Sequence, residues 1–253
     1  MANVFVSGGT GYLGRPMIAE LLRRGHSVKC LYRPRSRSRV PPGSMPVEGD
    51  PLSCGSFEFE VDPGDTFVHL TGTSHPAPWK SKQFEAVDGR SFEESLAVAR
   101  RSQVSHFVYL SVAHPAPIMR SYIEVRRRCE GRLVLSGLPV SILRPWYVLG
   151  EGHWWPYLLL PLYKAAEQSQ SWRAGALRLG LVTKDEMVAA LVWAVENPPL
   201  SIQTLPVPQI RAVGALNQPG GHRTALSAPV AGRPASAHLM EDRRFPQAPR
   251  RPH

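Results

Sequence analysis

Short apolar stretches alternate with longer amphipathic ones along most of the chain. Runs rich in Val, Phe, Leu and Tyr predict buried strands at residues 4–6, 28–32, 66–70, 106–111, 140–143 and 202–207. Between them, apolar residues recur at helical spacing, which predicts helices at residues 15–24, 84–101 and 121–136. A further helix is predicted after Thr183, because Thr183 and Glu186 form a capping box ahead of an apolar series. Strands that alternate with helices in this way predict a parallel sheet covered on both faces.

The first predicted strand runs directly into a glycine-rich turn with Gly8, Gly11 and Gly14, and a helix follows at once. One glycine allows the tight turn, one lets the backbone approach a pyrophosphate, and one lets the helix pack closely on the strand. The free N–H groups and the positive end of the helix dipole would face the phosphates. This context predicts a dinucleotide site, with a structural turn as the alternative. Its residues are Gly8, Thr10, Gly11, Tyr12, Leu13 and Gly14.

The end of the second strand decides which dinucleotide is favoured. An acidic residue at this point would bind the ribose hydroxyls, but this chain has Tyr32 followed by Arg33. Because an arginine fork suits a 2′-phosphate, we expect NADP(H) to bind in preference to NAD(H). Arg33 is the expected contact, with Arg35 or Arg15 as a helper. The alternative is that residues 33–39 form a solvated basic loop.

Composition excludes several classes of protein. Of the 253 residues, 43% are apolar and 20% are charged, which is typical of a soluble globular chain and not of a disordered one. No apolar stretch approaches the roughly 20 residues of a membrane-spanning helix, and the N-terminal segment does not have the pattern of a signal peptide. The three cysteines are scattered, and no short-spaced ligand set includes His75 or His114. We therefore expect a cytoplasmic protein without a disulfide framework or a metal site.

The formal net charge of +10 is concentrated partly at the C-terminal end. Residues 214–253 hold six arginines, two acidic residues, six prolines and four glycines, with almost no periodic apolar pattern. Such a segment cannot bury enough surface to offset its ordering entropy, which predicts a disordered basic tail after a folded body of residues 1–213. A basic excess attracts nucleic acid in general. Because aromatic interleaving and a recognised motif are missing, we expect no specific nucleic-acid partner.

Taken together, these residues resemble the short-chain dehydrogenase/reductase superfamily, in its extended and atypical branches, which include NmrA-like and epimerase-like NAD(P)H-binding proteins. The resemblance rests on residues 7–14, 49–50, 69–72, 109–111, 136–138 and 142–145. It implies a Rossmann-like doubly wound parallel sheet with a small substrate-covering part at about residues 146–200. It also implies that Leu70, Thr71 and Gly72 line the cofactor site. Asp50 either accepts a hydrogen bond from the adenine amino group or belongs to a simple turn.

Enzymes of this superfamily carry Ser or Thr at the end of the fifth strand and Tyr-x-x-x-Lys on the next helix. Ser111 and Tyr122 match, whereas Arg126 stands in place of the lysine. The resemblance implies an oxidoreductase or epimerase-like enzyme in which Tyr122 is the acid/base, Ser111 polarises a substrate carbonyl and Arg126 favours the phenolate. Arginine differs from lysine in its ability to relay a proton, so a non-catalytic NADP(H)-binding regulator or assembly protein is the alternative. Glu130, one turn further on, is expected to pair with Arg126 on the helix surface.

In that alternative, Tyr122 is a residue at the helix rim and Ser111 caps a loop.

Aromatic residues follow the strand that ends at Arg144, namely Trp146, Tyr147, His153, Trp154, Trp155 and Tyr157. This region bounds the substrate pocket in the family, so an apolar or aromatic small molecule is expected, with packing under a long loop as the alternative. His75 and His114 follow strand ends and are candidates for substrate contact. Residues 154–163 also suit a weak contact with a membrane surface.

Overall fold

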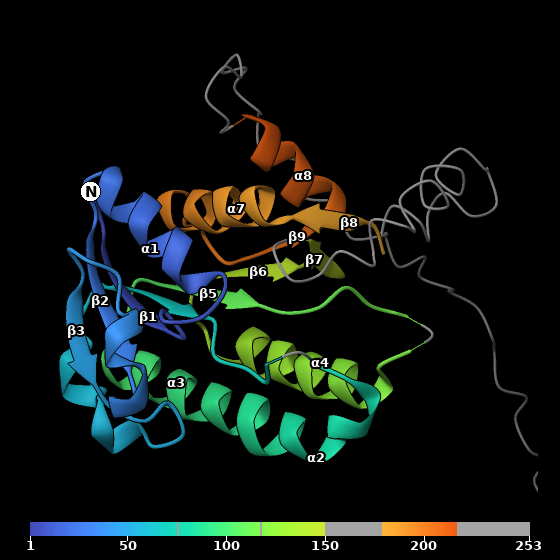
Figure 1. Ribbon diagram of the computed structural model, residues 1–253, viewed down its shortest axis with the longest axis horizontal. Helices are drawn as coiled ribbons and strands as arrows, with labels where there is room; N and C mark the ends of the chain where they lie inside the picture. The colour runs from blue at the N-terminus through green and yellow to red at the C-terminus, as the bar shows by residue number, and fades with distance from the viewer. Residues whose placement is uncertain (75, 117, 150–178, 217–253) are drawn as a thin grey trace, which may run out of the picture. The chain divides into compact units, whose positions relative to one another are not determined.

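A parallel sheet forms the centre of the protein and confirms the predicted Rossmann-like α/β fold (Figure 1). The computed structural model describes residues 1–74, 76–116, 118–149 and 179–216, all of them in one unit that spans Met1–His222. Within this part of the chain the strand order is β3-β2-β1-β4-β5-β6-β9. The strands are β1 (Asn3–Ser7), β2 (Ser27–Tyr32), β3 (Met45–Glu48), β4 (Thr66–His69), β5 (His106–Leu110), β6 (Val140–Arg144) and β9 (Ile202–Pro206).

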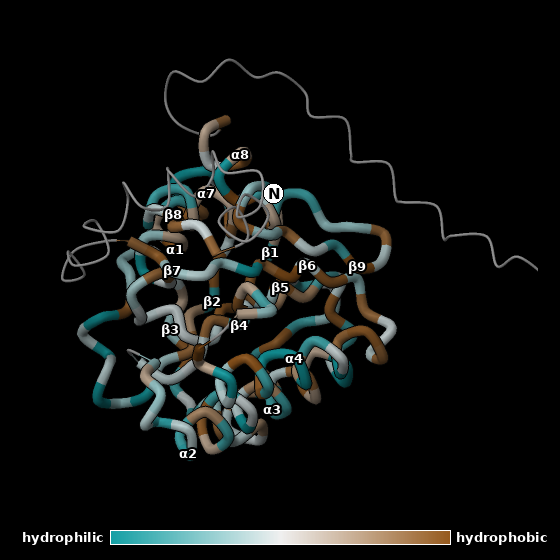
Figure 2. Tube along the Cα trace, turned by 90° about the vertical axis from the view of Figure 1, so that its right-hand side faces the viewer, coloured by the Kyte–Doolittle hydropathy of each residue, from teal (hydrophilic) through white to brown (hydrophobic). Residues whose placement is uncertain are grey.

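Helices cover both faces of the sheet, as the alternating pattern predicts. One face carries α1 (Gly14–Arg23), α7 (Lys184–Glu196) and α8 (Val207–Leu216), and the other carries α2 (Ser81–Gln83), α3 (Arg90–Arg101) and α4 (Arg120–Val134). Successive residues of a strand point to opposite faces. Val4 and Val6 therefore pack with α1 and α7, while Phe5 packs with Phe67 and Phe92 on the other side. Figure 2 shows these apolar strands between the more polar outer surfaces of the helices.

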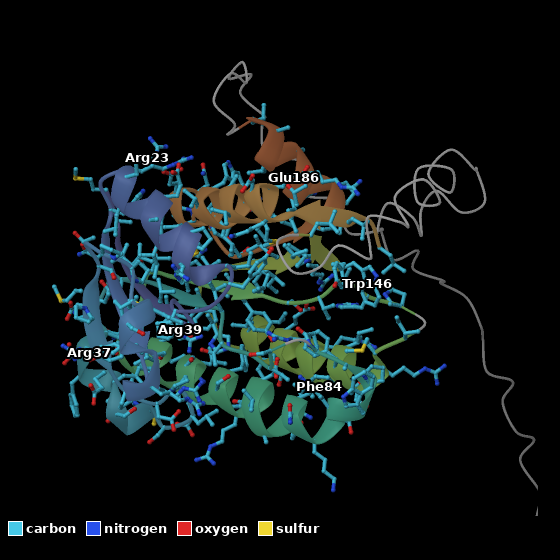
Figure 3. The ribbon with its side chains drawn as sticks, viewed as in Figure 1. Arg23, Arg37, Arg39, Phe84, Trp146 and Glu186 are labelled. Carbon is cyan, nitrogen blue, oxygen red and sulfur yellow. The ribbon has the colours of Figure 1, made fainter. Side chains whose placement is uncertain are left out.

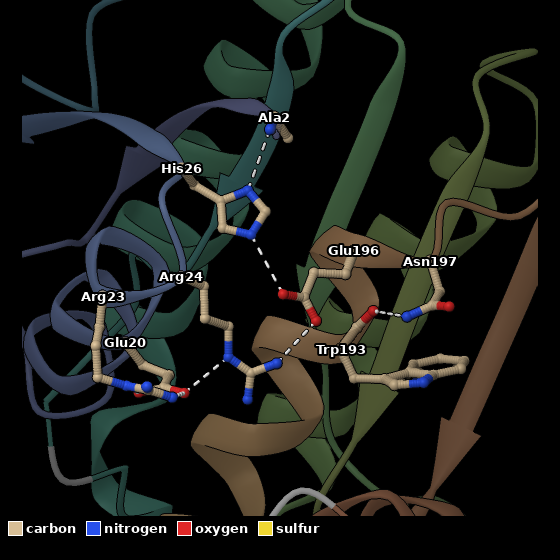
Figure 4. Close-up of polar contacts among 8 residues, drawn as sticks. All are labelled: Ala2, Glu20, Arg23, Arg24, His26, Trp193, Glu196 and Asn197. Carbon is tan, nitrogen blue, oxygen red and sulfur yellow. Dashed lines mark hydrogen bonds and ion pairs between the residues drawn. The ribbon is translucent and has the colours of Figure 1, made fainter. Parts of the chain in front are cut away.

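Polar contacts join α1 and the start of β2 to the C-terminal end of α7 (Figure 4). Arg24 Nη1 donates to Glu196 Oε2 at 2.9 Å, and His26 Nε2 lies 3.3 Å from Glu196 Oε1. Arg24 Nε also donates to Glu20 within α1 at 2.7 Å. Partly exposed ion pairs of this kind each contribute at most about 1 kcal/mol, so they orient the two helices and leave most of the stabilisation to the core.

Three elements differ from the predicted pattern. The first part of the predicted helix at residues 84–101 is a π-helix, η5 (Phe84–Gly89), and only then does α3 begin. Within the covering part expected at about residues 146–200, β7 (Tyr147–Leu149) pairs in parallel with β8 (Leu181–Thr183), and neither strand was predicted. The helix α8 was not predicted and runs beyond residue 213, the expected end of the folded body. The tail at residues 217–253 and the aromatic residues 153–157 lie outside the described residues.

One other expectation is confirmed within the described residues. The capping box of α7 is confirmed, because Glu186 N donates to Thr183 Oγ1 at 3.2 Å and Thr183 N donates to Glu186 Oε2 at 2.7 Å. Among the helices that the structure describes, none is long and apolar enough to cross a membrane.

Two buried histidines, His69 and His106, lie on neighbouring strands of the sheet and contact serine hydroxyls. His69 Nδ1 lies 3.0 Å from Ser7 Oγ and 3.1 Å from Ser95 Oγ, and His106 Nε2 lies 3.0 Å from Ser141 Oγ. The other ring nitrogen of each histidine has no hydrogen-bond partner among the described residues. Burial disfavours the imidazolium and lowers the pKa of His69 to about 3 and that of His106 to about 4.

These histidines predict a loss of stability in mild acid. The unfolded chain takes up protons at both rings below a pKa of about 6.5, whereas the folded protein does not until the pH approaches 4. The free energy of unfolding is therefore expected to fall as the pH decreases from 6.5, by about 2 kcal/mol for each histidine at pH 5. Urea unfolding at pH 7 and pH 5 measures this loss. The variant His106→Gln should halve it, and an unchanged loss would remove His106 as a cause.

Candidate functional site

The glycine-rich loop lies at the point where the strand order reverses. The chain leaves β1 toward β2 on one side, while β4 pairs with β1 on the other, and ligands of open parallel sheets bind in the crevice at such a point. Leu70 N donates to Ser7 O at 2.9 Å, which holds the two strand ends together. Gly8 has a φ of +81°, and a β-carbon there would lie 2.6 Å from Leu70 C and 2.7 Å from Thr71 N. The structure therefore brings the predicted cofactor residues of the two loops into direct contact.

The other glycines of the motif close the turn against the start of α1. Gly11 N donates to Gly8 O at 3.0 Å, and a β-carbon on Gly14 would overlap Gly8 O and the backbone of Gly9. The helix N-terminus has no side-chain cap and no acidic residue in its first turn. Such an N-terminus leaves N–H groups and positive dipole free for an anion.

The loop after β4 contains a buried polar group whose hydrogen bond is not made within the described residues. Thr71 Oγ1 is buried and has no hydrogen-bond partner in the part of the chain that the structure describes. A buried hydroxyl without a partner costs free energy, which a bound polar ligand would recover. The bare glycine cradle and this hydroxyl together fit a dinucleotide.

The remaining predicted residues of this loop have different surroundings. Tyr12 is partly exposed, its Oη donates to Leu149 O at 3.4 Å, and Lys184 Nζ lies 5.0 Å from the centre of its ring. Tyr12 thus links the glycine-rich loop to β7 and α7. Thr10 is partly exposed beside it, and Leu13 is the N-cap residue of α1.

At the adenosine end, the structure adds an acid that the sequence did not suggest. The hydroxyl of Tyr32 donates to Glu48 Oε2 at 3.0 Å and accepts from Arg37 Nη1 at 2.7 Å. Arg37 is therefore engaged, and Figure 3 shows it with Arg39 near β2 and β3. Arg33 is exposed just after β2. Asp50 Oδ1 accepts from Leu52 N at 3.1 Å in a turn, as one of the two expectations for this residue had it.

The candidate acid/base pair lies at the start of α4. Tyr122 is partly exposed, its ring packs against Phe84 with centroids 5.0 Å apart, and the Arg126 guanidinium carbon lies 5.1 Å from the centre of that ring. Arg126 is buried, with Nη1 donating to Leu110 O at 2.8 Å and to Tyr109 Oη at 3.3 Å. Its Nη2 donates to Asp88 Oδ1 at 2.5 Å. The spacing of four residues thus brings Tyr122 and Arg126 together as predicted.

Opposing effects act on the pKa of Tyr122, and that of Arg126 has the direction expected from the sequence. Burial raises the pKa of Tyr122, and the carboxylate of Asp88 adds to the increase, while the Arg126 charge opposes both. The carboxylate of Asp88 offsets part of the arginine's effect, and the net pKa of Tyr122 is raised. The phenol therefore keeps its proton near neutral pH, as an ordinary tyrosine also does.

Glu130 does not pair with Arg126, and the expectation of a surface ion pair was wrong. Glu130 is buried, and Arg144 donates to it from Nε at 2.9 Å and from Nη2 at 2.5 Å. Ser111 Oγ donates to Glu130 Oε1 at 2.5 Å, and His114 Nε2 lies 3.2 Å from Oε2. The two buried carboxylates thus bind different arginines: Asp88 binds Arg126, and Glu130 binds Arg144. The hydroxyl of Ser111 is thus engaged with Glu130.

Comparison with known proteins agrees with this architecture. The model of the NAD dependent epimerase/dehydratase family matches residues 4–202, which include the whole sheet up to the start of β9. The chain belongs to this family. A solved structure with the same fold is that of WbmH from Bordetella bronchiseptica in complex with NAD+, with a TM-score of 0.61 and 19% identity over 81% of this chain and 75% of that chain.

Curated proteins that resemble this chain in sequence have different names and roles. Divinyl chlorophyllide a 8-vinyl-reductase from Oryza sativa subsp. indica is 29% identical over 56% of this chain and 39% of its own length. The photosystem II assembly factor Ycf39 from Trieres chinensis is 27% identical over 56% of this chain and 44% of its own length. The chain therefore spans less than half the length of these two relatives in the aligned regions.

Sequence reasoning missed two residues of this candidate site, Asp88 and Glu48. Asp88 stands at one position of a series with a spacing of four residues, whose other members, Phe84, Phe92 and Leu96, are apolar and buried. A charged residue on such a buried helix face needs a buried partner. That interruption was a usable signal. Glu48 had none, because its contact with Tyr32 depends on the pairing of β2 and β3. Among the described residues no cluster of three or more His, Cys, Asp or Glu has the arrangement of a metal site.

Proposed function

We propose that this chain is an NADPH-dependent reductase of a small apolar or aromatic molecule. The proposal rests on one series of contacts that connects the phenol to the cofactor loop. Tyr122 lies on Arg126, Arg126 binds Asp88, and a β-carbon on Gly72 would lie 2.7 Å from Arg126 Nη2. Because Gly72 belongs to the loop beside the glycine-rich turn, these contacts support a phenol close to a dinucleotide that would bind at this turn.

The protonated phenol suits the reductive direction. A bound NADPH would supply a hydride to one atom of the substrate double bond, and the other atom of that bond then needs a proton. Tyr122 carries a proton at neutral pH, and burial raises its pKa further, so its Oη can donate that proton. Asp88 and Arg126 hold the tyrosine ring in place.

Exposed apolar side chains near the strand ends support an apolar substrate. Trp79, which follows β4, is 82% exposed, and Ile118, which follows β5, is 58% exposed. Trp146 lies just after β6, near the same ends of the strands (Figure 3). Loops after parallel strands form the ligand-binding edge of a sheet.

Arg33→Ala tests the cofactor preference. The guanidinium is exposed at the end of β2, where a 2′-phosphate would lie, and a hydrogen bond to a charged group contributes about 1.5–3 kcal/mol. The Kd for NADPH is expected to increase about tenfold or more, whereas the Kd for NADH stays the same. Energy transfer from tryptophan to the reduced nicotinamide measures both. The control Arg100→Ala removes the same charge from an exposed position on α3 and should change neither. Equal weakening of both cofactors by Arg33→Ala would refute the 2′-phosphate contact.

A non-catalytic NADP(H)-binding protein is the second candidate. The observation in its favour is that Ser111 donates to Glu130, so no free hydroxyl at this position polarises a substrate. A turnover screen with carbonyl compounds and conjugated alkenes, run with NADPH, separates the two candidates. Oxidation of NADPH with any of them supports the reductase. Tight NADPH binding without turnover across the panel supports the second candidate.

A further inference from the structure

A buried carboxylate in the π-helix holds three groups of the candidate site at once. Asp88 is 1% exposed and accepts from Arg126 Nη2 through Oδ1 at 2.5 Å. Its Oδ2 accepts from Thr73 N at 2.9 Å and from Thr73 Oγ1 at 2.6 Å. Single π-helical turns inside helices occur frequently at functional sites, and here the turn is η5, which directs residue 88 inward. One side chain thus joins α4 to the loop that follows β4.

The backbone of that loop lies directly on the ion pair. A β-carbon built on Gly72 would lie 2.7 Å from Arg126 Nη2 and 2.8 Å from Asp88 Oδ1. Gly72 and Thr73 directly follow Thr71, whose buried hydroxyl has no hydrogen-bond partner among the described residues. The ion pair therefore holds the backbone next to this expected cofactor contact. A shift of either charged group would therefore move both the loop and the tyrosine.

We propose that Asp88 is a positioning residue, which fixes the cofactor loop and Arg126 together and, by compensating the arginine charge, keeps Tyr122 as a proton donor. This proposal rests on the reductase function proposed above. Asp88 itself is too deeply buried to touch a substrate. In this chain the pair Asp88–Arg126 therefore acts as a neutral unit under the phenol.

Other charged groups near α4 do not take over this role. On η5 and α3, Glu85 binds Arg128 and Glu93 binds Arg132, both in exposed pairs. On η4 (Pro78–Lys80), Lys80 Nζ donates to Ser74 O at 2.7 Å. On β5 and β4, Tyr109 and His69 are buried, with a pKa well above the usual value for Tyr109 and about 3 for His69, so both are neutral. Arg126 and Asp88 remain the charges that govern Tyr122.

The test compares Asp88→Asn with the unaltered full chain, each saturated with NADPH. Asparagine keeps the shape and one acceptor but leaves the charge of Arg126 uncompensated. A pH titration followed by NMR of tyrosine labelled at Cζ reports the phenolate, and Tyr122→Phe assigns the signal among the seven tyrosines. The pKa of Tyr122 is expected to fall by about one to three units. The Kd for NADPH is expected to increase about tenfold, because the loop loses its charged acceptor.

A matched control is available on the same two elements. Glu85→Gln breaks the exposed pair between η5 and α4 and should leave both the titration of Tyr122 and the Kd for NADPH unchanged. The charge-neutral variant Asp88→Asn/Arg126→Gln should restore the high pKa of Tyr122, because both charges are gone. If Asp88→Asn does not fold, Arg126→Gln serves instead, and it should move the pKa of Tyr122 upward.

The outcomes distinguish this inference from the proposed function. A chain that binds NADPH but whose Tyr122 titrates alike with and without the charge of Asp88 overturns the positioning role. If the pKa of Tyr122 falls as expected in Asp88→Asn but the unaltered chain turns over no substrate, the positioning role is supported and the reductase function is overturned. If Asp88→Asn changed the Kd for NADPH but not the pKa of Tyr122, Asp88 would have only a structural role, and the inference would also be overturned.

Discussion

Replacing Tyr122 by phenylalanine is expected to lower NADPH-dependent turnover about 100-fold or more and to leave the Kd for NADPH unchanged. General acid catalysis by a positioned side chain contributes about 10²–10⁴-fold, and the phenol oxygen is the only atom removed. The ring contacts with Phe84 and Arg126 remain, so the fold is preserved. Steady-state oxidation of NADPH with the best substrate of the screen measures the effect. The loss should appear in kcat, because the proton moves only in the transition state.

Tyr109→Phe is the matched control for this variant. Tyr109 also lies on Arg126, with its Oη 3.3 Å from Nη1, but its side chain is fully buried and has no access to a substrate. Loss of that hydroxyl perturbs Arg126 without removing the proposed donor. Its effect on turnover should stay below about tenfold, on the scale of one hydrogen bond. Equal rates for Tyr122→Phe and the unaltered protein would exclude the phenol as the acid.

The elements that sequence patterns predicted well are those whose signals are local. The strand before Gly8 and the helix after Gly14 depend on residues within one turn of each other, and so does the capping box of α7. The parallel sheet covered on both faces followed from the alternation of strands with helices, whereas the order of its strands was not predicted. The cofactor loop could thus be located without knowledge of the remaining chain. In contrast, α8 has too short an apolar series to be separated from the strand before it.

The candidate catalytic site could be predicted only in part, because its charges pair across the fold. A spacing of four residues predicted both that Tyr122 meets Arg126, which was correct, and that Glu130 meets Arg126, which was wrong. Helical spacing shows which side chains lie close enough on a helix to interact. Which ion pairs form depends on competing partners, and here Asp88 and Arg144 come from elements distant in the sequence. Unpaired buried charges are costly, so each buried carboxylate takes the arginine that the packing brings closest.

Gly8→Ala is expected to weaken NADPH binding about 100-fold or more. The φ of +81° costs an alanine about 1–2 kcal/mol, and the added carbon would lie within 2.8 Å of Leu70 and Thr71 backbone atoms. The loop can relieve this overlap only by moving away from β4, which misaligns the N–H groups that would hold the pyrophosphate. Two lost hydrogen bonds to a charged group correspond to about 3–6 kcal/mol. Isothermal titration with NADPH measures the change.

Two further glycines separate the causes of this loss. Gly64 has a φ of +84° with nothing within 4 Å of its β-position, so Gly64→Ala carries the backbone strain without the overlap. Gly131 has open space and lies within α4, so Gly131→Ala carries neither. Gly64→Ala should lower the melting temperature and leave the Kd unchanged, and Gly131→Ala should lower neither stability nor affinity. If Gly8→Ala bound NADPH as tightly as these two controls, the crevice between β1 and β4 would not be the dinucleotide site, and the phenol of Tyr122 would lose its proposed hydride donor.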